Sequence, residues 1–226
     1  MPPDVNKRSY DRSTRQAAST ATRQRIVDAA RFLMIQRGYR QTTISSIAQR
    51  AEVNLDTVYE LVGRKPVLLR EVIEQAISGT DHAVTAEDRD YVKAIRVEPD
   101  PVRKLAIYAK ALVATHQRLA PLFLALRDAS STEPEARQVW EAISRRRAAN
   151  MRKFARDLQQ TGRLRMGLSI DEAADTIWAT NSAELFVLLT VERRWSTRRY
   201  EHWLADTWTR LLLGPETSTV VPLGDD

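Results

Sequence analysis

The chain has 226 residues but no cysteine, and it has only three histidines, His82, His116 and His202. Without cysteine there is no disulfide bond and no thiolate metal site, and the histidines are too widely spaced to form a local metal-binding motif. We therefore expect no metal or redox cofactor.

The sequence also lacks a long apolar segment. The apolar run from Leu185 to Leu189 has five residues, whereas a membrane-spanning helix needs about 20. The N-terminus has no apolar stretch of the kind found in signal peptides. These absences predict a protein that has no membrane partner and stays in the cytoplasm.

Motifs of several enzyme classes are missing too. There is no glycine-rich phosphate loop, no His-x-x-x-His pair and no serine in a nucleophile elbow. Carboxylates such as Asp171, Glu172 and Asp175 are placed where negative charge at a helix N-terminus is favourable. We therefore expect that the chain is not an enzyme.

The residues that are present predict an all-α protein. Hydrophobic residues make up 43% of the chain and charged residues 28%, which is ordinary for globular domains, and no alternating strand pattern occurs. Val67 and Leu68 are expected to face the core, and Ser169 with Glu172 forms a capping box. Apolar periodicity, capping residues, glycine and proline predict helices over residues 22–37, 66–78, 86–96, 101–120, 121–129, 133–160, 170–194 and 197–213.

Residues 42–65 have the pattern of two short helices joined by a tight turn. Thr43 can cap the first helix, in which Ile47 and Ala48 are inward-facing. Asn54 can cap the second helix, which runs from Leu55 to about Leu61. Most of the second helix is polar and left outside the core. A helix so short that exposes most of its residues is poorly suited to stability alone, and it indicates a surface that reads DNA.

Positive charge is concentrated next to this helix pair. Residues 1–40 contain nine basic and three acidic residues, a net charge of +6, which equals the net charge of the whole chain. This excess would attract phosphates without regard to sequence. The basic runs Arg145–Arg147 and Arg193–Arg194 lie beside acidic residues, so we interpret them as solvated helix faces with intrahelical ion pairs.

The motifs in this region form an ordered series, which is Arg37-Gly38-Tyr39, Thr42-Thr43-Ile44, Ile47-Ala48, Ala51-x-Val53, Thr57-Val58-Tyr59 and Lys65 before Leu68-Leu69. In this order and spacing they resemble the bacterial tetracycline-repressor-like (TetR) family of transcriptional regulators. Glu52 and Asp56 stand where that family often has glycine, and Val62 stands where phenylalanine is frequent. A left-handed backbone at Glu52 would cost about 1–2 kcal/mol for a residue other than glycine.

The resemblance implies an N-terminal three-helix helix-turn-helix DNA-binding domain and a C-terminal helical ligand-binding and dimerisation domain. We predict a disordered basic arm over residues 1–19, the DNA-binding domain over 20–66, the effector-binding and dimerisation domain over 67–214, and a flexible tail over 215–226. The implied function is a sequence-specific DNA-binding transcriptional regulator. In the family it is most often a repressor released from its operator by a small molecule.

The implied partner is double-stranded DNA with a palindromic operator, read by a homodimer. The acidic side chains of Asp56 and Glu60 could accept a hydrogen bond from cytosine N4, or Asp56 could serve only as a favourable negative charge in the first turn of its helix. Phosphates are expected to be bound by Arg40, Thr43, Lys65 and, as in the family, Tyr59. The full set of residues expected at the DNA is Arg40, Thr42, Thr43, Asn54, Leu55, Asp56, Thr57, Tyr59, Glu60 and Lys65.

The C-terminal helices supply the remaining expectations. Their apolar surface is wider than one stripe, which favours a subunit interface, and in the family these helices pair with their copies as a four-helix bundle. The expected anchors of the homodimer are Phe186, Leu189, Trp203 and Trp208. The expected lining of a pocket for an unknown small-molecule effector is Tyr108, His116, Phe123, Trp140, Phe154, Trp178 and Asn181.

One alternative stays open at this stage, a helical protein-interaction module without DNA binding. Such a module does not explain why the polar helix over residues 55–60 lies next to the whole excess of positive charge. Binding to duplex DNA that weakens with salt would separate the two interpretations.

Overall fold

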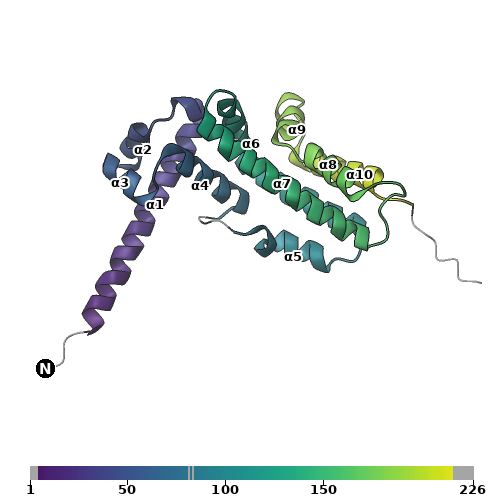
Figure 1. Ribbon diagram of the computed structural model, residues 1–226, viewed down its shortest axis with the longest axis horizontal. Helices are drawn as coiled ribbons and strands as arrows, with labels where there is room; N and C mark the ends of the chain where they lie inside the picture. The colour runs from purple at the N-terminus through teal and green to yellow at the C-terminus, as the bar shows by residue number, and fades with distance from the viewer. Residues whose placement is uncertain (1–4, 81, 83, 216–226) are drawn as a thin grey trace, which may run out of the picture. The chain divides into compact units, whose positions relative to one another are not determined.

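The computed structural model describes residues 5–80, 82 and 84–215. Within these ranges the chain is helical and has no strand beyond an isolated β-bridge between Leu164 and Leu213 (Figure 1). The predicted all-α fold is confirmed. In chain order the elements are α1 (Val5–Gln41), α2 (Ile44–Ala51), α3 (Leu55–Leu61), α4 (Lys65–Ser78), the 3-10 turn η1 (Ala86–Asp88), α5 (Asp90–Val97), α6 (Pro101–Ser130), α7 (Pro134–Gln160), α8 (Ile170–Thr180), α9 (Ala183–Val187), the π-helical turn η2 (Leu188–Glu192) and α10 (Thr197–Leu212).

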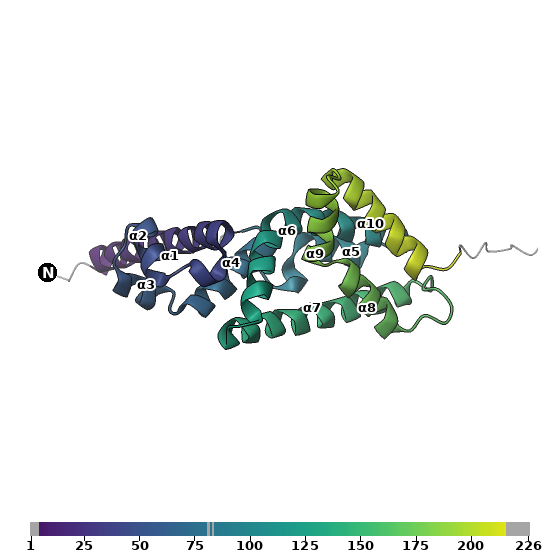
Figure 2. The same ribbon diagram turned by 90° about the horizontal axis from the view of Figure 1, so that it is seen from above.

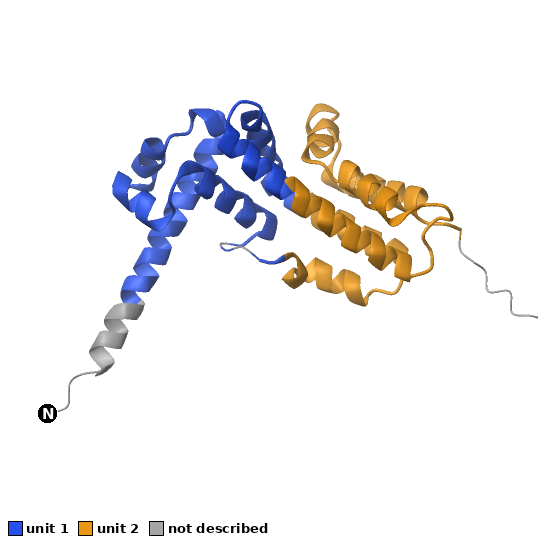
Figure 3. Cartoon of the chain, viewed as in Figure 1, with its two compact units in different colours: residues 1–85, 115–143 blue, residues 86–114, 144–226 orange. Residues whose placement is uncertain are grey.

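The chain divides into two compact units (Figure 3), the first formed by residues 1–85 and 115–143 and the second by residues 86–114 and 144–226. The boundary passes through α6 and α7, so each of these helices contributes to both units. This division differs from the predicted boundary after residue 66, because α4 packs its apolar face on α1 and so belongs to the first unit. Among the described residues there is no helix with the length and apolar character needed to cross a bilayer.

Helix α1 begins earlier than the sequence pattern indicated. A disordered arm was predicted over residues 1–19, but residues 5–19 are helical, while residues 1–4 lie outside the described part of the chain. Residues 14–19 include arginine, glutamine and alanine, which are good helix formers. Adding residues to a helix that is already nucleated is far easier than starting one, so the packed turns of α1 can extend outward without further tertiary contacts.

The first unit buries one side of each of its helices. Figures 1 and 2 show α1, α2 and α3 side by side, and α4 also contacts α1. Val67 was predicted to face this core, but it is 52% exposed. Its neighbours Leu68 and Leu69 are fully buried. Successive helical residues are about 100° apart, so a stripe centred on these leucines leaves Val67 outside.

Helix α2 begins at a capping box, and the turn from α2 to α3 contains one residue with an unusual backbone. The Thr43 hydroxyl accepts a hydrogen bond from Ser46 N at 3.0 Å, and the Ser46 hydroxyl accepts one from Thr43 N at 3.1 Å, which forms a capping box. Glu52 ends α2 in the left-handed region with φ 56° and ψ 48°. Asn54 has the backbone of an N-cap for α3, although its side chain makes no capping hydrogen bond, contrary to our expectation.

The second unit is organised around Tyr108 of α6, which is 7% exposed. The centroid of its ring lies 5.2 Å from that of Phe154, 5.3 Å from that of Trp208 and 6.0 Å from that of Tyr91. Trp208 is fully buried, and its indole nitrogen donates to the Thr180 hydroxyl at 2.7 Å. Through these contacts α5, α6, α7, α8 and α10 share one core.

Two predicted helix boundaries are wrong. Pro121 was expected to separate two helices, but α6 continues through it. A proline within a helix removes one hydrogen bond and can bend the helix without ending it. In contrast, the helix predicted to run to residue 194 ends at Thr180. A new helix, α9, begins after Ser182, whose hydroxyl accepts a hydrogen bond from Leu185 N at 3.2 Å as its N-cap.

The left-handed residue at the α2–α3 turn generates a stability prediction. We expect Glu52→Gly to stabilise the protein by about 0.5–1 kcal/mol, because glycine avoids the strain of this backbone but loses more conformational freedom on folding. Urea denaturation of the full chain measures the difference. Glu52→Ala is the matched control, since it removes the side chain and keeps Cβ. A Gly variant no more stable than the Ala variant would show that the turn carries no strain.

Candidate DNA-binding surface and ligand pocket

Helix α3 presents a mixed face to solvent. Val58 is fully buried, while Leu55 is 44% and Tyr59 49% exposed. Asp56 and Glu60 are also exposed, and their spacing of four residues puts them on the same side of the helix. Among the predicted DNA contacts Asn54 is exposed as well, and Thr57 is half-buried. The expected DNA-reading helix is therefore accessible along most of its length.

The two adjacent threonines before α2 have different roles. Thr42 was predicted to contact DNA, but it is fully buried and its hydroxyl donates to Gly38 O at 2.8 Å. This hydrogen bond spans the kink within α1 at Gly38, which has φ 75°. The prediction for Thr42 is therefore wrong. Thr43 is exposed at the N-terminus of α2, which is a position that favours anions.

Lys65 and Arg40 lie together near the N-terminus of α4. The Lys65 ammonium lies 3.9 Å from the centroid of the Tyr39 ring and donates to Arg40 O at 3.5 Å. Burial lowers the pKa of Lys65 below its usual value, and the negative charge of Glu133 acts in the opposite direction. The Arg40 guanidinium lies 3.9 Å from the Glu133 carboxylate. Glu133 therefore acts on both of the cations expected to bind phosphate.

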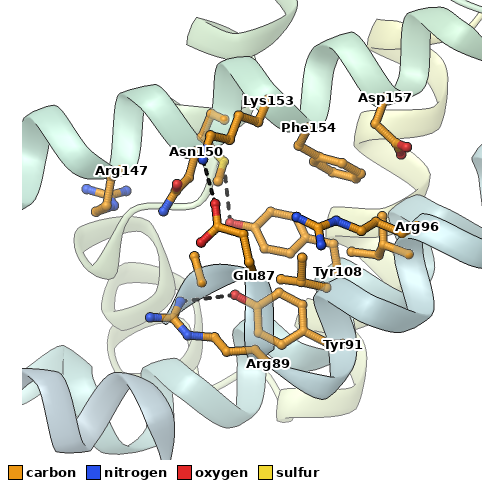
Figure 4. Close-up of a pocket in the computed structure, with 14 residues that line it drawn as sticks. Glu87, Arg89, Tyr91, Arg96, Tyr108, Arg147, Asn150, Lys153, Phe154 and Asp157 are labelled. Carbon is orange, nitrogen blue, oxygen red and sulfur yellow. Dashed lines mark hydrogen bonds and ion pairs between the residues drawn. The ribbon is translucent and has the colours of Figure 1, made fainter. Parts of the chain in front are cut away.

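The second unit contains a cavity of about 210 Å³ between α5 and α7. Figure 4 shows Glu87, Arg89, Tyr91 and Arg96 on one side of it and residues of α7 on the other, with Tyr108 between them. The Tyr108 hydroxyl accepts a hydrogen bond from Asn181 Nδ2 at 2.7 Å. The full lining is Ala86, Glu87, Arg89, Tyr91, Val92, Ile95, Arg96, Tyr108, Arg147, Asn150, Met151, Lys153, Phe154 and Asp157.

The predicted effector residues separate into two groups. Tyr108 and Phe154 line the cavity, and Asn181 and Trp178 lie directly behind its lining. The other three, His116, Phe123 and Trp140, belong to the first unit and do not line this cavity, so their contact with an effector stays a prediction. Phe123 and Trp140 pack on each other there with centroids 4.7 Å apart, and His116 is 4% exposed.

Sequence reasoning missed the charged part of the lining. Arg147 was interpreted as part of a solvated run, but it is half-buried and its guanidinium donates to Trp178 O at 3.3 Å and to Asn181 O at 3.2 Å. A signal was present, since Arg147, Met151 and Phe154 have the spacing of one helical face. The run of three arginines concealed it.

The predicted dimer anchors differ in their exposure. Trp208 is fully buried inside its own chain, so it is not available to a partner, and that prediction is wrong. Phe186 is 6% exposed and packs edge-on against Tyr200 with centroids 5.2 Å apart. Leu189 and Trp203 are half-buried. The most exposed large apolar side chains in η2 are Leu188 at 45% and Val191 at 64%, which the sequence analysis had not selected.

No metal site is found within the described ranges, because no three His, Cys, Asp or Glu side chains gather closely enough. The two candidate sites in the described ranges are the α2–α3–α4 region in the first unit and the cavity in the second.

Residues 26–72 match the family model described as bacterial regulatory proteins of the tetR family. No curated protein matches the chain. Among solved structures, the chain is similar to a protein described as a transcriptional regulator from Saccharomonospora viridis in complex with choline, with 20% identity, 85% of this chain and 98% of that chain covered, and a TM-score of 0.65.

Two further structures have the same fold. A protein described as a TetR-family transcriptional regulator from Rhodococcus sp. is 16% identical, with 85% of this chain and 98% of that chain covered and a TM-score of 0.63. SmeT, solved as a complex with triclosan, is 20% identical, with 91% of this chain and 98% of that chain covered and a TM-score of 0.64. The predicted resemblance is confirmed, and the two-domain helical fold is that of these regulators.

The position of Glu133 generates a prediction about DNA affinity. We expect Glu133→Gln to strengthen binding to any duplex about two- to fivefold, the size of one solvent-screened charge pair, because it frees Arg40 and Lys65 from a competing carboxylate. Fluorescence anisotropy with a labelled duplex at low salt measures the change. Glu201→Gln in α10 makes the same charge change and should leave affinity as it is. Unchanged or weaker binding by Glu133→Gln would contradict the role of this carboxylate.

Proposed function

We propose that the chain is a sequence-specific DNA-binding transcriptional regulator, because residues 26–72 match the tetR-family model and the chain has the fold of TetR-family regulators. It acts as a homodimer on a palindromic operator, and it is a repressor that a small molecule releases. The observation that carries this proposal is the exposed face of α3, which follows a tight turn after α2 and buries little more than Val58. Such a helix fits the second helix of a helix-turn-helix, whose exposed side chains reach base edges in the major groove.

The two acidic residues of α3 support a more specific proposal. The side-chain carboxylates of Asp56 and Glu60 have no hydrogen bond or ion pair with any other described residue. A free carboxylate facing DNA is repelled by phosphates unless it accepts a hydrogen bond from a base, and cytosine N4 is the donor that acidic side chains accept from in the major groove. At least one of the two therefore reads a cytosine, and the operator has C·G pairs near the centre of each half-site.

Selection of binding sites from random duplexes tests this proposal with wild type, Asp56→Ala and Glu60→Ala. A reading residue should lose preference at one operator position, which corresponds to about 1–3 kcal/mol of discrimination. If both variants bind every site more tightly and keep the wild-type preferences, the acids are only repulsive.

Lys65→Ala is the comparison that distinguishes loss of a phosphate contact from loss of base reading in the Asp56 and Glu60 variants. It removes a phosphate contact, so it should weaken binding to selected and random duplexes alike and reduce the slope of log affinity against log salt by about one. An unchanged slope would remove Lys65 from the contact set.

Dimerisation is proposed for the face that α9, η2 and α10 leave partly open. Leu188 and Val191 expose large apolar side chains there, and Leu189 and Trp203 are half-buried. A dimer would cover these side chains and allow two half-sites to be read together.

A Leu189→Asp, Trp203→Asp double variant should sediment as a monomer or aggregate, since truncating a central interface aromatic commonly costs about 2 kcal/mol or more. The control is Val97→Asp with Met166→Asp, which charges two exposed apolar positions elsewhere and should remain dimeric. A double variant at Leu189 and Trp203 that stays a stable dimer would place the interface on another face.

Release by a ligand needs a path from the cavity to the DNA-binding helices. Helix α6 carries Tyr108 in the cavity lining, and ten residues later it carries Arg118, whose Nε donates to Ala76 O at 3.1 Å. Ala76 lies in the last turn of α4, and α4 begins at Lys65. If α6 can adopt two placements, a ligand that binds the protein more tightly in one of them favours that placement. The contact between Arg118 and α4 would then shift α4 as well, and the size of the population shift is set by the ratio of the ligand's two affinities.

A further inference from the structure

The cavity in the second unit is lined by more cations than anions. Its lining contains four basic side chains, Arg89, Arg96, Arg147 and Lys153, and two acidic ones, Glu87 and Asp157, which gives a formal charge of +2. This balance is the reverse of what a positively charged ligand requires.

Both acidic side chains are held by lysines of the protein. Lys153 Nζ lies 2.5 Å from the Glu87 carboxylate, and this interaction lowers the pKa of Glu87. Lys104 Nζ lies 2.8 Å from the Asp157 carboxylate and also donates to Ile95 O at 2.6 Å. Lys104 is 3% exposed, so Asp157 compensates a buried charge and is not available for a ligand cation.

Three guanidinium groups complete the charged lining. Arg89 and Arg96 stand at the two ends of α5, and Arg147 faces them from α7 (Figure 4). Among its contacts, Arg147 donates to the carbonyl oxygens of Trp178 and Asn181 and to the side-chain oxygen of Asn181. Burial lowers the pKa of Arg147, and Tyr108 and Glu184 oppose that effect. A ligand carboxylate would place negative charge next to the partly desolvated Arg147 guanidinium. A guanidinium can donate two parallel hydrogen bonds to one carboxylate.

Apart from the amide of Asn150, the rest of the lining is apolar or aromatic. Tyr91 and Phe154 both pack against Tyr108, and Ala86, Val92, Ile95 and Met151 complete the surface. The volume of about 210 Å³ lies below the roughly 300–1,000 Å³ of sites for drug-sized molecules. The body of a ligand is therefore compact and apolar, with one ring or a short branched chain.

We propose that the effector is a compact organic anion, an aromatic or branched carboxylate whose body packs on Tyr91 and Phe154 and whose carboxylate is bound by arginines of the lining. This assignment rests on the proposed function, because it gives the chemistry of the ligand that would control DNA binding. The same charge balance disfavours quaternary ammonium compounds and amines as ligands.

Calorimetric titration of the full-length, DNA-free protein tests the proposal with matched ligands. Phenyl, indole and branched aliphatic skeletons are each used as the carboxylate, the neutral amide and the amine, with choline as a further cation. At least one carboxylate should bind about tenfold or more tightly than its amide, and the amines and choline should not bind. If an amide or a cation binds as well as the carboxylate, or if no carboxylate binds, the proposal is wrong.

Arg96→Gln shows whether the anion is bound in this cavity. It should weaken binding of the carboxylate about three- to tenfold and leave any binding of the amide unchanged, because only the charged hydrogen bonds are lost. Lys93→Gln removes an exposed charge from the same helix outside the lining and should not change affinity. Equal effects of the two substitutions, or of Arg96→Gln on carboxylate and amide, would contradict the site.

DNA binding is measured separately, so that the class of ligand and the control of DNA binding by that ligand are tested independently. A carboxylate that binds the free protein through Arg96 and releases it from DNA supports both. A carboxylate that binds in the same way and leaves DNA affinity unchanged supports the ligand class and contradicts ligand control. Release from DNA by cations alone contradicts the ligand class and supports ligand control.

Discussion

The hydrogen-bonded burial of Tyr108 is the constraint on which the second unit depends. A phenol removed from water needs a partner for its hydroxyl, and Asn181 supplies one from the end of α8. The ring meanwhile packs against Tyr91, Phe154 and Trp208, which come from three other helices. One face of this cluster closes the core, and another forms a wall of the cavity. Packing of the unit and the shape of the cavity therefore depend on the same side chain.

Much of the fold was predictable because local signals and packing agree. Thr43 and the Ser169–Glu172 pair cap helices where the sequence placed them, and Gly79 ends α4 with a left-handed backbone. The boundaries that failed depend on tertiary contacts. Pro121 does not end α6, and the chain turns at Asn181, where the side chain is committed to Tyr108. The Ser182 cap of α9 was a local signal that the sequence reasoning did not use.

A candidate site formed by residues close together in the sequence was easier to predict than one formed by residues from several helices. The exposed face of α3 follows from the periodicity of seven residues, so it was found. The cavity gathers residues from α5, α6 and α7, and sequence periodicity cannot distinguish an aromatic residue that lines it from one in another core. Phe123 and Trp140 were selected for that reason, while Arg147 was passed over because arginine in a basic run is usually solvated. Thr42 and Trp208 show the same limit, since both are polar or amphipathic residues whose hydrogen bonds are satisfied inside the chain.

The central claim is that a short exposed helix in a positively charged N-terminal domain reads a specific DNA sequence. The most direct measurement is selection of duplexes from a random library by the full-length protein, followed by affinity measurements over a range of salt concentrations. We expect enrichment of an inverted repeat whose half-sites are separated by about one helical turn or a multiple of it, with affinity that falls steeply as salt rises. Recovery of unrelated sequences, or affinity that does not depend on salt, would contradict the account.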